Sequence, residues 1–371
     1  MTAAAVPFVD LAPQHQSLKE AILADVGELL DSGAFVNGEP VDAFERSFAA
    51  FCGRMFCVGV SSGLDALRIA LLAAGIEPGD GVIVPANTFI ATFEAVTQAG
   101  GVPVVVDSTE LDYNIDPASV EAAVTDRTRF ILPVHLYGHL ADVNALETVA
   151  DAHTLRMVED ACQAHGASRD GRVAGSVGVA GAFSFYPAKN LGAVGDAGAL
   201  VTDDEALARA ALSLRQHGEV EKYRSVRPGY TARLDTLQAL VLLRKLRHLP
   251  EWNRQRRDAA AFYAAELDGI GDLRLPPSVP GSDPVWHLYV IRTRDPAALA
   301  SSLRARGIAT ARHYPELPHL SGAYAELGLR RGSFPVAERI SAEALSLPLF
   351  PGISDEQLAR VIAGVREFFG A

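Results

Sequence analysis

The chain has 371 residues, enough for two domains around a shared core, and its 49% hydrophobic and 21% charged residues are typical of a globular protein. Its 33 Lys and Arg residues against 45 Asp and Glu give a net charge of −12, which argues against a nucleic-acid-binding protein with a basic face. No apolar run reaches the roughly 18 residues of a membrane helix, and the start of the chain lacks the basic and apolar parts of a leader. Because the three cysteines form no metal-type cluster, we expect reduced thiols in a cytoplasmic protein that contacts no membrane.

The first quarter of the chain predicts two helical stretches and then a strand, a tight turn and a helix. Helical periodicity runs from about Gln14 to Leu30 and again from Val41 to Phe51. The strand–turn–helix pattern follows within residues 57–71, with the turn at residues 61–65. The amides at such a helix N-terminus are a ready phosphate site, although a plain helix cap would look the same.

Strands and helices then alternate up to residue 134. We expect strands at residues 81–85, 102–107 and 130–134, and helices at residues 89–99 and 117–124. Strands separated by helices imply a mostly parallel sheet with right-handed crossovers. Binding sites in such sheets lie at the carboxyl ends of the strands.

Two residues in the middle of the chain carry the strongest chemical signal. A short apolar strand ends in Asp160, the kind of carboxylate that pairs with the pyridinium nitrogen of pyridoxal phosphate. Lys189 lies between two apolar runs and is followed by glycines that let the backbone approach a ligand, at positions 192, 195 and 198. Burying an ammonium is costly, and a Schiff base with a carbonyl would relieve that cost. A surface lysine on a loop is the alternative.

Other polar patterns in this region point to no metal or dinucleotide. The spacings of His135, His139, His153 and His165 fit no closed tetrahedral site, so we expect no metal. The glycine-rich runs at residues 175–181 and 192–198 lack the fingerprint of a strand-to-helix turn, which argues against an NAD site.

The last part of the chain predicts a helix over residues 205–216, a basic loop, a long helix and a second domain. The loop, residues 218–235, concentrates Lys222 and three arginines on an acidic protein, which suits a diphosphate, although a solvated charged loop is the default. The long helix spans about residues 236–267 with a break at Pro250. A proline-rich connector follows, and we divide the chain into an N-terminal segment with a large domain, 1–250, and a small domain, 251–371.

Two motifs together resemble a known family. They are Asp160-Ala-Cys-Gln-Ala-His-Gly166 and Phe183-Ser-Phe-Tyr-Pro-Ala-Lys-Asn-Leu-Gly192, and they are similar to those of the DegT/DnrJ/EryC1/StrS sugar aminotransferases. The resemblance covers nearly the whole chain. It implies an α/β fold like that of aspartate aminotransferase (fold type I), with a mostly parallel central sheet in the large domain and a smaller C-terminal α/β domain.

The resemblance also implies roles for individual residues toward pyridoxal 5'-phosphate. Lys189 forms the Schiff base and moves protons, and Asp160 keeps the ring nitrogen protonated. The further cofactor contacts it implies are Phe89 on the ring face, Gln163 at the ring hydroxyl, and Ser184 with Gly63 and the amides of Leu64 and Asp65 at the phosphate.

The implied reaction is transamination of a nucleotide-linked keto sugar with L-glutamate as donor. Residues 60–67 and 132–138 look most like the dTDP-3-keto-6-deoxyhexose enzymes, and the 4-keto enzymes are close. Family dehydratases carry histidine in place of this lysine, so Lys189 favours transamination. The remaining alternatives are another pyridoxal-dependent lyase or dehydratase, a non-catalytic regulator, and an aldolase without cofactor.

Family members are homodimers with composite sites, and this implies further contacts. Tyr186, Lys222, His313 and Tyr314 are the expected substrate-binding residues. Thr231 is the expected cofactor contact across the subunit interface, where the family often has asparagine.

Overall fold

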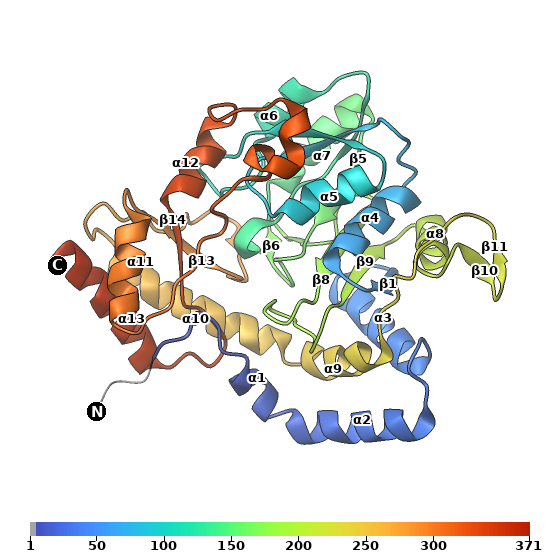
Figure 1. Ribbon diagram of the computed structural model, residues 1–371, viewed down its shortest axis with the longest axis horizontal. Coiled ribbons are helices and arrows are strands. Elements are labelled where there is room, and N and C mark those ends of the chain that lie inside the picture. The colour runs from blue at the N-terminus through green and yellow to red at the C-terminus, as the bar shows by residue number, and fades with distance from the viewer. Residues whose placement is uncertain (1–4) are drawn as a thin grey trace.

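The computed structural model describes residues 5–371, which begin with three helices that pack beside the main body (Figure 1). These are α1 (Ala12–Gln16), α2 (Lys19–Ser32) and α3 (Glu39–Phe51). The single helix predicted from Gln14 to Leu30 is thus two, and α2 ends at Gly33, which adopts the left-handed conformation with φ +67°. Helix α3 buries Val41, Phe44 and Phe48 against the core.

A seven-stranded sheet forms the centre of the molecule. Its strands are β1 (Phe56–Val60), β2 (Gly81–Pro85), β3 (Val102–Val106), β4 (Thr128–Ile131), β5 (Arg156–Asp160), β8 (Ala180–Ser184) and β9 (Gly198–Thr202). Their order is β1-β9-β8-β5-β4-β2-β3. Only β9 runs antiparallel to its neighbours, so the sheet is mostly parallel, as the sequence predicts. Because β1 and β8 both oppose β9, they share one direction and end at the same edge.

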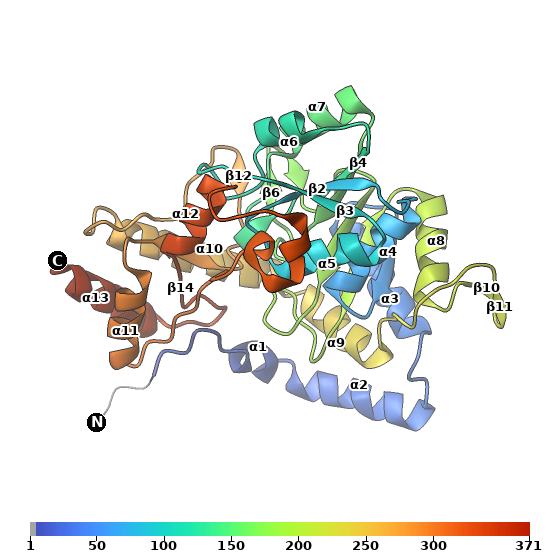
Figure 2. The ribbon, with the colours of Figure 1, turned by 45° about the horizontal axis from the view of Figure 1, so that its top comes forward.

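Helices cover both faces of the sheet (Figure 2). The helices between the strands are α4 (Gly63–Ala73), α5 (Ile90–Gln98), α6 (Pro117–Ala123), α7 (Val143–His153) and α8 (Glu205–Arg215), with the short 3-10 helix η1 (Leu136–Gly138). Strand β2 shows why both faces need a cover, since Val82 and Val84 join one apolar cluster while Ile83 joins the other. This two-sided burial is typical of parallel sheets.

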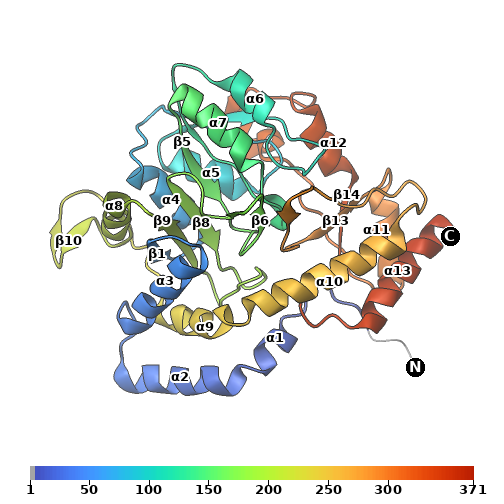
Figure 3. The same cartoon turned by 180° about the vertical axis from the view of Figure 1, so that it is seen from behind.

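Helix α10 connects the sheet region with the C-terminal part (Figure 3). The long helix predicted over 236–267 is α9 (Thr236–Leu246) followed by α10 (Leu249–Leu267). The break lies just before Pro250, which occupies the first turn of α10, where a missing N–H costs nothing. Because α10 runs through residue 250 without interruption, the domain division at 250/251 stays a prediction.

The C-terminal part packs three α-helices and two 3-10 helices around a two-stranded sheet. Its elements are β13 (Tyr289–Arg292), α11 (Pro296–Ala305), η2 (Pro318–Leu320), η3 (Gly322–Leu327), α12 (Pro335–Glu343), β14 (Ala344–Leu347) and α13 (Asp355–Phe369). Short strands complete the fold: β6 (Ser168–Arg169), β7 (Arg172–Val173), β10 (Glu219–Glu221), β11 (Arg224–Ser225) and β12 (Ser282–Asp283). Strands β10 and β11 form an arm that projects away from the body (Figure 1). Within residues 5–371, no helix has the length and apolar character needed to cross a membrane.

Candidate active site

A cavity of about 510 Å³ opens at the carboxyl ends of the central strands. Ten of the predicted site residues line it: Gly63, Leu64, Phe89, Asp160, Gln163, Ser184, Tyr186, Lys189, His313 and Tyr314. They come from the segments that follow β1, β2, β5 and β8 and from the loop before η2. The fold therefore brings together residues that are up to 251 positions apart in the sequence.

Asp160 is a buried carboxylate in this cavity and is held by two hydrogen bonds. Its side chain is 6% exposed, and its Oδ2 accepts a hydrogen bond of 2.9 Å from the Thr92 hydroxyl, while its Oδ1 accepts one of 3.2 Å from the Cys162 amide. Thr92 in turn is 2.7 Å from the hydroxyl of Thr88. Among the residues that the structure describes, no cation forms an ion pair with Asp160. A buried carboxylate without a cation is costly, so this site fits a ligand that brings a positive N–H group.

Lys189 lies in the loop between β8 and β9 and faces the same cavity. Burial lowers the pKa of its ammonium below the ordinary lysine value, and nearby Cys162 and Asp160 work in the opposite direction. Its backbone amide donates to the Tyr186 carbonyl over 2.8 Å, which closes a turn just after β8. A lysine with a lowered pKa is more readily a neutral amine, the form that attacks a carbonyl.

The N-terminus of α4 forms a narrow cradle beside Ser184. A Cβ atom on Gly63 would lie 2.6 Å from Ser184 Cβ and 2.8 Å from Cys162 Sγ, so only glycine fits there. The Asp65 amide donates to Ser62 Oγ over 3.1 Å. That contact is the helix cap left open as an alternative in the sequence, so the predicted phosphate contact of Asp65 has a competitor. A helix N-terminus with a serine hydroxyl next to it is a donor set that fits a phosphate.

Three further predicted residues, Gln163, Phe89 and His313, are held by contacts that mostly involve the C-terminal part. Gln163 accepts the Tyr137 amide at 2.7 Å and donates to the Tyr314 hydroxyl at 3.0 Å. The rings of Phe89 and Tyr314 are 5.4 Å apart. His313 is 2.8 Å from Ser346 Oγ, and burial lowers the pKa of its imidazole to about 4.

Three predicted residues do not line the cavity within one chain. Asp65 points back to Ser61 and Arg68, with which it forms close contacts. Lys222 and Thr231 are exposed near the β10–β11 arm, and Thr231 Oγ1 lies 3.4 Å from His217 Nε2. Their roles stay predictions.

Thr92, Arg256 and His287 also line the cavity, and no sequence pattern singles them out. The sequence around Thr92 is typical of a helix without a special role. Arg256 has four charged neighbours in α10, and such a pattern predicts a solvent-exposed helix face. The roles of Phe89 and Gln163 could be predicted only from the resemblance to the family.

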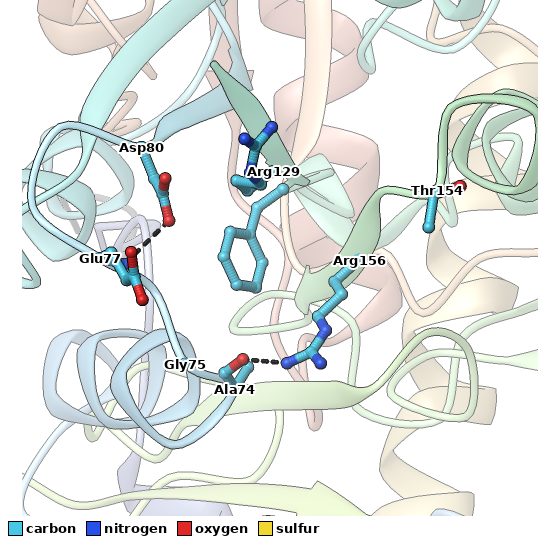
Figure 4. A pocket seen from close by; sticks show the side chains of 8 residues that line it. Ala74, Gly75, Glu77, Asp80, Arg129, Thr154 and Arg156 are labelled. Atoms are coloured by element: carbon cyan, nitrogen blue, oxygen red, sulfur yellow. Dashed lines mark hydrogen bonds between the residues drawn. The ribbon is translucent and has the colours of Figure 1, made fainter. Parts of the chain in front are cut away.

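A second cavity, of about 350 Å³, lies at the opposite edge of the sheet (Figure 4). Arg129 and Arg156 reach into it, and Arg156 donates to the Ala74 carbonyl at the end of α4. Arg156 begins β5 and Asp160 ends it, so the two cavities are about 13 Å apart along that strand. Within residues 5–371 no group of three or more His, Cys, Asp or Glu side chains is arranged to hold a metal ion.

Comparison with known proteins identifies relatives along the whole chain. A protein named erythromycin biosynthesis sensory transduction protein EryC1, from Saccharopolyspora erythraea, is 48% identical over 97% of this chain and 99% of its own length. The dTDP-3-amino-3,4,6-trideoxy-alpha-D-glucose transaminase of Streptomyces venezuelae is 47% identical over 98% of this chain and 96% of its own.

Solved structures agree with these relatives. The crystal structure of DesV from S. venezuelae in complex with a ketimine intermediate superposes with a TM-score of 0.97 at 47% identity, covering 100% of both chains. NtdA from Bacillus subtilis, solved with bound cofactor PMP, has a TM-score of 0.92 at 33% identity, over 100% of this chain and 86% of that one. Residues 16–366 match the sequence profile of one family. The chain therefore belongs to the DegT/DnrJ/EryC1/StrS aminotransferase family, whose members depend on pyridoxal phosphate.

Proposed function

We propose that this protein transfers an amino group from L-glutamate to carbon 3 of a nucleotide-linked 3-keto-6-deoxyhexose, with dTDP as the nucleotide. The main support for this proposal is that Lys189 and the carboxylate of Asp160, which forms no ion pair, share one cavity at the carboxyl edge of the sheet. Relatives at 41–47% identity are named as transaminases of dTDP-3-amino sugars, which supports the carbon and the nucleotide.

The cavity residues fit pyridoxal phosphate as follows. Asp160 would pair with the ring nitrogen, and the α4 N-terminus with Ser184 would hold the phosphate. Phe89 would lie against the ring, and Gln163 would meet the ring hydroxyl. When bound, the cofactor supplies an electron sink for the carbon that loses its proton.

The chain's own residues then provide proton transfer and orientation. The Nζ amine of Lys189 would act as the general acid/base, accepting the proton from the donor carbon and giving it up again to the carbon that is protonated later in the half-reaction. Burial lowers the pKa of this amine, which favours its neutral form relative to an exposed lysine. The Thr92 hydroxyl and the Cys162 amide hold the Asp160 carboxylate in place by their hydrogen bonds.

We further propose a homodimer in which each site is completed by the neighbouring chain. The basic arm carries Lys222 and exposes the apolar side chains of Tyr223, Val220 and Val226, of which Tyr223 is 87% exposed. Lys222 and Thr231 would contact the neighbour's substrate and cofactor phosphate, while Tyr186, His313 and Tyr314 contact the sugar in the same chain. The cytoplasmic location and the division at 250/251 remain expectations of this proposal.

The test is an assay of the protein with pyridoxal phosphate, L-glutamate and a panel of dTDP-3-keto and dTDP-4-keto sugars. We expect 2-oxoglutarate to form with the 3-keto substrate, and Lys189→Ala to abolish both turnover and the borohydride-reducible adduct on the protein. Activity confined to the 4-keto sugars would move the reaction to carbon 4. The regulator hypothesis, suggested by the name of the EryC1 relative, requires that no keto sugar be aminated.

A further inference from the structure

The proposed mechanism gives no role to Arg256, a charged residue of the cavity. Arg256 lies on α10, is 3% exposed and lines the same cavity as Lys189. Its Nη1 donates to three backbone carbonyls, those of Trp286 at 3.2 Å, His287 at 3.3 Å and Leu349 at 3.0 Å. These contacts fix the guanidinium in place but leave its charge without a counter-ion.

The missing counter-ion sets Arg256 apart from the other buried arginines. Arg169 pairs with Asp112 and Asp142, Arg215 with Glu45, and Arg292 with Glu110 and Glu343. Across residues 5–371, no carboxylate pairs with Arg256, and its buried Nε has no hydrogen-bond partner. A buried, unpaired charge is costly, and such groups are normally matched by an opposite charge.

The groups beside Arg256 make this wall of the cavity basic. His287 adjoins Arg256, whose Nη1 donates to the His287 carbonyl at 3.3 Å, and both residues line the cavity with Lys189. Burial lowers the pKa of the His287 imidazole, and the charges of Lys189 and Arg256 lower it further. The buried Nδ1 of His287 also lacks a partner among the described residues. Burial lowers the pKa of Arg256 to about 10, so the guanidinium remains charged at pH 7.

The acidic groups of the cavity do not offset this charge. Asp160 is engaged by Thr92 and the Cys162 amide. Glu94 and Asp196 also line the cavity, and no ion pair joins either of them to Arg256. A small anion bound in this cavity at Arg256 and His287 would therefore meet one fixed guanidinium without a counter-ion and one imidazole nitrogen without a partner.

We propose that Arg256 binds a carboxylate of the amino donor and so acts as a specificity residue for L-glutamate; this inference rests on the proposed function. A carboxylate matches the planar edge of a guanidinium and forms charge-assisted hydrogen bonds with it. The donor must place its amino group at Lys189, and Arg256 lines the same cavity as that lysine. We assign the diphosphate instead to the exposed basic arm that carries Lys222.

The test compares the two half-reactions of the holoenzyme in Arg256→Gln and Arg256→Lys. The matched control is Arg257→Gln, since Arg257 is the next residue on α10 and pairs at the surface with Asp283 at 3.4 Å. In single-turnover experiments we expect the apparent Kd for L-glutamate to rise at least about 30-fold in Arg256→Gln, with a smaller rise in Arg256→Lys. The Kd for the keto sugar and the thermal midpoint should stay near those of the control.

A second measurement uses glutarate, a dicarboxylate with no amino group, as a probe of the same site. Calorimetric titration should show binding to the wild-type holoenzyme and to Arg257→Gln, and its loss in Arg256→Gln. A crystal structure of the wild-type holoenzyme with glutarate should place a carboxylate on the Arg256 guanidinium. The wild-type crystal structure does not depend on whether the variants fold.

Several results would overturn the inference. An equal fall in both half-reactions would make Arg256 a packing residue, and a selective loss of keto-sugar binding would assign it to the diphosphate. Glutarate bound elsewhere in the wild-type crystal would contradict it as well. The glutamate half-reaction and glutarate binding need no sugar, so they remain measurable if no 3-keto sugar is aminated and the proposed function fails.

Discussion

At the scale of single residues, the charge of Asp160 is the feature on which cofactor chemistry depends. Asp160→Asn keeps the shape but removes the charge, so the cofactor should still bind while kcat falls roughly 100-fold or more. Thr92→Val removes the hydrogen bonds of the Thr92 hydroxyl to Asp160 Oδ2 and to the Thr88 hydroxyl, and it should lower kcat about 10-fold. Steady-state kinetics on variants with native circular dichroism would check both. Near-normal turnover in Asp160→Asn contradicts the pairing with a ring nitrogen.

A second residue-scale prediction concerns the buried His139. Burial lowers the pKa of its imidazole to about 4, so the folded state holds it neutral while the unfolded state takes up a proton near pH 6.5. Its contribution to stability is therefore complete above pH 6.5 and lost as the pH falls from 6.5 toward 4. This loss is on the order of 3 kcal/mol.

Urea unfolding between pH 4.5 and 7 measures this effect. His139→Gln should flatten the fall in unfolding free energy, whereas His153→Gln, at a half-exposed position beside Glu121, serves as control and should leave the slope nearly unchanged. An unaltered slope in His139→Gln would show that this ring is not held neutral by the fold.

At the scale of elements, the close approach of α4 to β8 is the feature that shapes the phosphate cradle. Gly63→Ala would place a Cβ 2.6 Å from Ser184 Cβ, so α4 must shift and the affinity for pyridoxal phosphate should fall. The control is Gly27→Ala in α2, where nothing lies within 4 Å of the new Cβ and the helix should gain about 1 kcal/mol. Fluorescence titration of the apoenzyme gives the affinities. An unchanged Kd in Gly63→Ala would exclude this cradle.

Much of this element arrangement follows from the sequence, because apolar runs and helical periodicity report local burial. The predicted strands at 81–85 and 102–107 and the helix at 205–216 match β2, β3 and α8 to within a residue. The antiparallel direction of β9 has no such local signal, since it depends on which strands pair after folding.

Local sequence signals also explain which residues of the site could be predicted and which could not. Asp160 and Lys189 could be found because each interrupts or ends an apolar run, which is unusual for a charged residue. Arg256 could not, because a buried arginine on a helix with charged neighbours reads like an exposed one. Thr92 becomes visible only when α5 is packed against the end of β5.

At the scale of the whole molecule, the proposed composite site predicts complementation between two inactive variants. Lys189→Ala lacks the catalytic amine, and Thr231→Arg should block the neighbour's phosphate site. In a mixed dimer one site combines the intact lysine with the intact loop, so up to about a quarter of the wild-type activity should return after joint unfolding and refolding. If mixed dimers form, as shown by native mass spectrometry, and stay inactive, Thr231 serves its own chain.

A labelling experiment that follows the nitrogen atom from L-glutamate to the sugar tests the proposed amino transfer. The holoenzyme is incubated with ¹⁵N-labelled L-glutamate and a dTDP-3-keto-6-deoxyhexose, and the sugar product is examined by NMR. If the proposed transamination is right, we expect ¹⁵N bonded to carbon 3 and one 2-oxoglutarate for each amino sugar formed. Nitrogen at another carbon, or a product that carries no label, would contradict it.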